Sequence, residues 1–149
     1  MRLRDVELGD VDAYVRMRCD PVMTAELGGP LPREGIEDKV ARDVQAVAAG
    51  TDWIKMILPG EAAPDVVAGS VTLWSHDEDS EPVSEIGWMV LPEFQGRGLA
   101  KRAVRVLLEL LRRQVPVEID AGSIRKARAN EVSQPPRRRP DVRATRRDS

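Results

Sequence analysis

The stretch Pro92–Val104, PEFQGRGLAKRAV, joins an apolar segment, EIGWMVL at 85–91, to a segment with the spacing of an amphipathic helix. It places Gly96 and Gly98 around Arg97, directly before the helical pattern begins. The first N–H groups of a helix have no intrahelical partner, and the helix dipole adds partial positive charge there, so an anion is favoured at this position. Glycine removes the Cβ that would keep a phosphate away, and arginine adds a full charge. The stretch predicts a phosphate-binding turn, with a glycine pair that only closes a tight turn as the plainer alternative.

Two better-known phosphate motifs do not fit this turn. The run from Gly96 to Lys101 lacks the last glycine of a dinucleotide fingerprint, and no Gly-Lys-Ser/Thr follows to form a nucleoside triphosphate loop. The segments before the turn also indicate antiparallel strands, whereas those motifs belong to repeated parallel βαβ units.

Outward from the turn, the patterns predict one α/β domain with a mainly antiparallel sheet. Alternation at 2–8 indicates an edge strand, and extended segments at 52–58, 66–74 and 83–91 form a meander through a turn at 59–65 and an acidic loop at 75–82. VPVEIDA at 115–121 reads as a further strand.

Helical periodicity and capping residues predict four helices. They cover 10–19, a short segment that starts at Asp20-Pro21, 33–50 with Gly50 at its C-terminus, and 98–113. In the last of these, the residues expected on the buried side are Leu99, Ala103, Leu107 and Leu110.

Composition restricts the class of protein. The 149 residues suit one domain, and the 3% of aromatic residues offer few platforms for stacking bases. Residues 1–96 carry 8 basic and 19 acidic side chains, and residues 97–149 carry 15 and 6. The basic second half could meet nucleic acid, an anionic cofactor or the acidic first half, so charge alone does not choose, and we expect no nucleic-acid partner. Cys19 is the only cysteine, and no apolar run reaches the roughly 20 residues of a membrane span. We expect a cytoplasmic protein without a metal centre or membrane anchor.

The run from Gln95 to Ala100, QGRGLA, resembles the Gln/Arg-x-x-Gly-x-Gly/Ala signature of the GCN5-related N-acetyltransferase (GNAT) family. The setting is similar too, because in that family the signature follows the fourth strand and opens the third helix. The segment LRDVELGDVDAYVRMRCDP resembles the opening of the branch that includes ribosomal-protein N-terminal acetyltransferases. The resemblance covers about residues 1–133 and implies a GNAT-like mixed sheet flanked by helices, with acetyl-coenzyme A as cosubstrate.

The resemblance also implies roles for particular residues. The backbone N–H groups of Gln95, Gly96, Arg97, Gly98, Leu99 and Ala100 would hold the cofactor's pyrophosphate, and the strand edge at Met89, Val90 and Leu91 would pair with its pantetheine arm. The side chains of those strand residues have core packing as their structural alternative. Asn130, in the run NEVS, would approach the cofactor.

Glu85 is the candidate general base. Under period-two alternation it shares a strand face with Gly87 and Met89, and a carboxylate can take the proton of an attacking amine directly or through water. The alternative is that Glu85 only completes a polar strand face. His76 falls in the expected acidic loop, where a solvated histidine is the simpler interpretation.

The C-terminus departs from the family pattern. Where a last helix and two strands should follow, the sequence reads QPPRRRPDVRATRRDS from Gln134 to Ser149, which cannot bury a core. We therefore expect an acetyltransferase domain at 1–133, incomplete at its C-terminus, with an exposed sheet edge that a homodimer would cover, and a disordered tail at 134–149.

The sequence thus favours an N-acetyltransferase that acts on a small-molecule or peptide amine by direct attack on the thioester. The alternative is a catalytically impaired or non-enzymatic protein that binds coenzyme A or uses its basic tail for binding.

Overall fold

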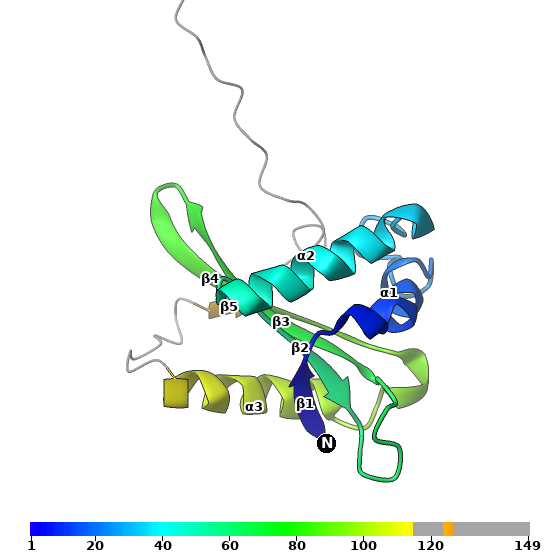
Figure 1. Cartoon of the computed structure of the whole chain (residues 1–149). Coiled ribbons are helices and arrows are strands. Elements are labelled where there is room, and N and C mark those ends of the chain that lie inside the picture. Colours follow the sequence, from blue (N-terminus) through cyan, green and yellow to red (C-terminus); the bar gives the residue numbers. More distant parts are fainter. Residues whose placement is uncertain (115–123, 127–149) are drawn as a thin grey trace, which may run out of the picture.

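The computed structural model of the chain describes residues 1–114 and 124–126 (Figure 1). The strand expected at 115–121, Asn130, the missing last helix and strands, and the tail at 134–149 lie outside the described residues. Side chains are described for residues 1–114 only.

A mixed sheet forms the centre of the molecule. Its strands lie in chain order: β1 (Arg2–Asp5), β2 (Trp53–Leu58), β3 (Gly69–Glu78), β4 (Glu81–Val90) and β5 (Ile124–Lys126). The first four strands are antiparallel, and β5 is parallel to β4. The predicted meander and the edge position of β1 are confirmed.

Helices cover both faces of this sheet (Figure 1). α1 (Val11–Arg18) and α2 (Ile36–Ala49) lie on one face, and α3 (Leu99–Gln114) lies on the other. Short 3-10 helices, η1 (Leu8–Asp10), η2 (Arg33–Gly35) and η3 (Pro92–Phe94), precede the three α-helices. The mixed α/β class is therefore confirmed.

The core has two parts, one on each face of the sheet. Under α3, the aliphatic side chains of the sheet meet one stripe of the helix; the buried residues are Ile57, Val71, Leu73, Ile86, Leu99, Ala103, Leu107 and Leu111. Under α1 and α2, the buried residues are Val6, Tyr14, Met17, Ile36, Val40, Ile54, Met56 and Leu91. Because side chains alternate along a strand, Ile86 belongs to the α3 side and its neighbour Glu85 to the other.

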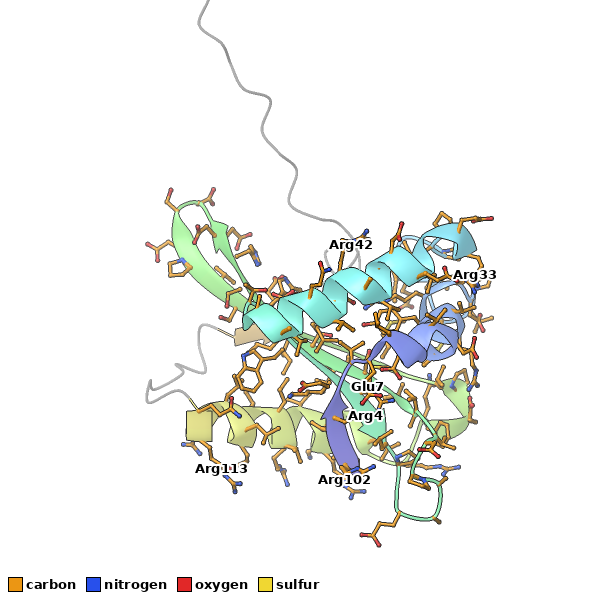
Figure 2. All side chains as sticks on the ribbon, viewed as in Figure 1. Arg4, Glu7, Arg33, Arg42, Arg102 and Arg113 are labelled. Carbon is orange, nitrogen blue, oxygen red and sulfur yellow. The ribbon has the colours of Figure 1, made fainter. Side chains whose placement is uncertain are left out.

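The predicted α3 stripe is wrong at one position. Leu111 is 3% exposed, whereas Leu110 is only half-buried. A step of four from Leu107 keeps the side chain on the face that meets the sheet, and a step of three turns it aside. Figure 2 shows Arg102 and Arg113 pointing away from the sheet, as the helical pattern predicts.

The short helix expected from Asp20-Pro21 is absent, and residues 21–28 form turns. The Asp20 carboxylate accepts hydrogen bonds from the N–H groups of Val22 and Met23, at 2.7 and 3.4 Å. Gly28 and Gly29 then adopt positive φ angles of 84° and 94°, which a continuing right-handed helix does not permit. The local bonds of an aspartate turn replace a helix here.

The acidic loop expected at 75–82 is also wrong, because these residues extend β3 and β4 into a long hairpin. Only Asp79 and Ser80 form the turn, both with positive φ, as two-residue hairpin turns require. The hydroxyls of Ser75 and Ser84 hydrogen bond across the two strands at 2.9 Å. In Figure 1 this hairpin projects beyond the rest of the sheet.

Candidate functional site

The glycine turn links η3 to α3 on the surface. Gly96 and Gly98 have φ angles of 75° and 69°, which favour glycine, and a Cβ at either position would have no atom within 4 Å. The first bond into α3 runs from the Arg102 N–H to the Gly98 carbonyl, at 3.1 Å. The N–H groups at the start of the helix, from Leu99 on, precede this first bond and have no intrahelical acceptor one turn back.

The other predicted members of the turn have partners within the protein. The Gln95 N–H donates to the Pro92 carbonyl, at 3.2 Å. The Arg97 guanidinium lies 5.5 Å from the centre of the Phe94 ring, a cation–π distance that holds this charge beside the turn. The turn therefore presents a positive charge in addition to the N–H groups of the helix start.

A cleft of about 560 Å³ lies against this turn. Its walls come from the end of β4, from η3 and the turn, from the first residues of α3, and from the turns after α1; the lining residues are Val22, Met23, Leu27, Trp88, Met89, Val90, Pro92, Phe94, Gln95, Gly96, Gly98, Leu99 and Ala100. The volume is in the range of small-molecule sites. The structure thus brings most of the predicted cofactor-binding residues to one cavity.

The end of β4 has a different neighbourhood from its middle. In the described residues, β5 pairs with β4 at Ser84–Ile86, whereas the cleft begins at Trp88. The Gln95 side-chain amide donates to the Val90 carbonyl, at 2.8 Å. This hydrogen bond between two lining residues therefore links the end of β4 directly to the glycine turn.

Leu91 does not line the cleft. Its side chain is 1% exposed and packs in the core under α1 and α2. Its N–H donates to the Ala68 carbonyl at 2.8 Å, and its own carbonyl accepts from the Phe94 N–H at 2.9 Å. Leu91 anchors the end of the strand to the core.

Glu85 is completely buried, on the face of β4 that α1 and α2 cover. It lies opposite Trp74 in the register, and alternation places Gly87 and then the cleft residue Met89 on the same face. A carboxylate on the strand that leads into the cleft has the chemistry of a proton acceptor.

His76, which the sequence analysis read as a solvated loop histidine, lies on β3 beside Glu85. Its Nδ1 is 3.9 Å from a carboxylate oxygen of Glu85, and its side chain is 37% exposed. The imidazole thus stands between the buried carboxylate and solvent. Once β3 is extended to Glu78, period-two alternation and the pairing of Trp74 with Glu85 put both residues on one face.

The sequence analysis also missed the apolar part of the cleft. Trp88 and Phe94 were given no role, and the lining residues Val22, Met23 and Leu27 follow Asp20-Pro21, where a short helix was wrongly expected. The structure leaves Val22 80% exposed in this turn, which the sequence pattern did not indicate.

The described part of the chain has neither a cluster of metal-ligand residues nor a helix of membrane-spanning length. No group of three or more histidine, cysteine, aspartate or glutamate side chains there could hold a metal ion. In residues 1–114 and 124–126, no helix is long and apolar enough to cross a membrane.

Comparison with known proteins gives a family match and a fold match. A family model described as an acetyltransferase (GNAT) domain matches residues 1–134. No curated protein matches the chain. Solved acetyltransferases resemble it at identities that establish the fold alone.

Three of these structures illustrate the range. A GNAT-family acetyltransferase from Bacillus anthracis is 22% identical, with a TM-score of 0.59, over 77% of this chain and 64% of its own. A Salmonella typhimurium acetyltransferase that modifies the N-terminal serine of ribosomal protein L7/L12 is 18% identical, with a TM-score of 0.55, over 83% and 66%. A ribosomal-protein-S5-alanine acetyltransferase from Vibrio fischeri is 14% identical, with a TM-score of 0.58, over 74% and 63%. The match thus spans less than two thirds of the length of each relative.

Proposed function

The chain belongs to the acetyltransferase (GNAT) family, and from this premise we propose that it transfers an acetyl group from acetyl-coenzyme A to a primary amine. The observation that carries the proposal is the cleft, which joins the end of β4 to a glycine turn at a helix start. We assign this activity to residues 1–133, with 134–149 as a tail outside the domain.

The turn fits a pyrophosphate by its chemistry. The open space at Gly96 and Gly98, the Arg97 charge and the N–H groups at the start of α3 all favour an anion. We assign phosphate binding to Gly96 through Ala100, with Gln95 as the residue that ties the turn to Val90. Asn130 stays a proposed cofactor contact that lies outside the described residues.

The strand end fits an extended amide-containing arm. Met89 and Val90 line the cleft, beyond the stretch of β4 that pairs with the described part of β5. An arm with amide groups could add to this strand as a further strand would. Leu91, whose backbone groups already have partners, would hold the strand end in place.

Glu85 would act as the general base. When bound, the thioester supplies an activated acetyl group, and an amine must lose a proton to complete its attack. Glu85 would accept that proton directly or through a water molecule. His76, 3.9 Å away and partly exposed, would then pass the proton to solvent.

The acceptor is an amine on a small molecule or a peptide. Two of the structural relatives act on ribosomal proteins, as their names state. A peptide N-terminus is therefore the first acceptor to test, followed by free amino acids and polyamines.

Thiol release from acetyl-coenzyme A tests this function. The full chain should release thiol only when an acceptor amine is present, and the acetylated product should carry one added acetyl group by mass. A chain that binds acetyl-coenzyme A but gives no amine-dependent release with any acceptor class would refute the transferase proposal and leave a binding protein.

A further inference from the structure

Arg18, at the end of α1, is a buried arginine whose guanidinium makes no ion pair within 4 Å with a carboxylate of the described residues. Arg18 is 7% exposed, and its enclosed Nε has no hydrogen-bond partner in the part of the chain that the structure describes. Its guanidinium lies 5.6 Å from the centre of the Tyr14 ring. Buried charges in proteins are ordinarily paired and hydrogen bonded, so this arrangement calls for an explanation.

The nearest carboxylate already serves other groups. Asp43 on α2 accepts a hydrogen bond from the Tyr14 hydroxyl at 2.7 Å and lies 3.3 Å from the Lys39 ammonium. Burial and then the Asp43 charge raise the pKa of Tyr14, so its hydroxyl stays neutral. Asp43 also acts on Arg18 through its charge, but among the described residues it accepts hydrogen bonds from Tyr14 and Lys39 and none from the Arg18 guanidinium.

A purely structural role for Arg18 accounts for its contact with Tyr14 but not for its enclosed Nε. The Tyr14 ring accounts for one face of the guanidinium, but a ring face accepts no strong hydrogen bond from the enclosed Nε. Burial also lowers the pKa of Arg18, as expected for a charge that the protein solvates poorly. Retaining such a group calls for a partner that arrives from outside.

We propose that Arg18 binds a carboxylate group of a small ligand beside Tyr14, between α1 and α2. A carboxylate is planar and matches the fork of a guanidinium with two parallel hydrogen bonds. The 7% of Arg18 that remains exposed leaves an approach for a small group only.

This site is separate from the cleft, since Arg18, Tyr14 and Asp43 are not among the residues that line it. The proposal therefore stands whether or not the chain transfers acetyl groups. The carboxylate has two sources: a free small acid, or an acceptor amine that also carries a carboxylate.

The first experiment follows the unfolding midpoint of the full chain as sodium acetate replaces sodium chloride at constant ionic strength, with acetamide as the neutral probe. The midpoint should rise with the logarithm of acetate concentration and stay constant in acetamide. Arg18→Met should abolish the rise. Arg42→Met is the matched control, because Arg42 projects from the outer side of α2 (Figure 2), and it should respond as the wild type does. A folded wild type that acetate does not stabilise overturns the proposal, as does an unchanged response in Arg18→Met.

If Arg18→Met does not fold, Arg18→Lys keeps the charge and removes the fork. Acetate should then bind on the order of tenfold more weakly, because one of two parallel bonds is lost. An acetate affinity equal to that of the wild type contradicts recognition by the guanidinium. Glycine and glycinamide, compared as acetyl acceptors, identify the source of the carboxylate. A preference for glycine that Arg18→Lys removes assigns the carboxylate to the acceptor. Equal use of glycine and glycinamide assigns it to a separate small acid.

Discussion

Gly69 on β3 lies against the carbonyl of Met89 on β4 so closely that a Cβ at position 69 would stand 2.1 Å from that oxygen. The same Cβ would lie 3.0 Å from the Cα of Val90, which is opposite Gly69 in the register. Met89 and Val90 both line the cleft. The absence of a side chain on β3 therefore sets the path of β4 where it enters the candidate site.

Gly69→Ala should displace the end of β4, because the added methyl meets backbone that a rotamer change does not relieve. We expect a loss of about 1–3 kcal/mol in the free energy of unfolding and weaker binding of acetyl-coenzyme A. Denaturant unfolding and calorimetric titration measure the two effects. Gly60→Ala is the control, since a Cβ there meets nothing within 4 Å. Equal behaviour of the two variants would show that the close approach has no role.

The glycine turn is tested by a pair of variants that differ only in charge. Asn and Asp have the same size and both tolerate the positive φ of Gly98, so Gly98→Asn and Gly98→Asp should destabilise the fold similarly. Gly98→Asp should bind acetyl-coenzyme A about tenfold or more weakly than Gly98→Asn, because its carboxylate repels the phosphates. Indistinguishable affinities for the two variants would argue against a phosphate at this turn.

Glu85→Gln removes the proposed base and keeps the shape of the buried side chain. Amine-dependent turnover should fall by about a hundredfold or more, while affinity for acetyl-coenzyme A stays as in the wild type. Glu81→Gln, an exposed change on the same strand, should leave both quantities unchanged. Wild-type turnover in Glu85→Gln would exclude Glu85 as the base.

The stability of the fold should depend on Asp52 in a defined direction of pH. Burial and then the Asp43 charge raise the pKa of the Asp52 carboxyl above its ordinary 3.8, so the folded state holds this proton more tightly than the unfolded state. The ionised Asp52 therefore destabilises the fold above the raised pKa, and this effect disappears as the pH falls below the unfolded value. Asp52→Asn should raise the unfolding midpoint at neutral pH, with a gain that shrinks toward pH 3.8. A gain independent of pH would contradict this cause.

The sequence predicted best those features that depend on neighbouring residues. The end of α2 at Gly50, with φ of 72°, was predicted because glycine favours this conformation after a helix, and the glycine pair at Gly96 and Gly98 predicted the turn that precedes α3. Apolar periodicity likewise placed α2, α3 and the strands of the meander.

Features that depend on tertiary contacts were missed. Asp77, Glu78 and Glu81 have low strand propensity, and the hairpin turn at Asp79-Ser80 contains no glycine, so local signals favoured a loop at 75–82. The approach of His76 to Glu85 depends on the register of that hairpin. Choosing Leu111 over Leu110 required the position of the sheet, because a 3.6-residue period permits steps of three and four.

The most direct test of the cleft and its glycine turn is calorimetric titration of the purified full chain with acetyl-coenzyme A, together with the unfolding midpoint with and without that ligand. We predict saturable binding at one site and a midpoint that rises with ligand concentration. A folded chain that neither binds acetyl-coenzyme A nor gains stability from it would contradict the assignment of the cleft as the cofactor site.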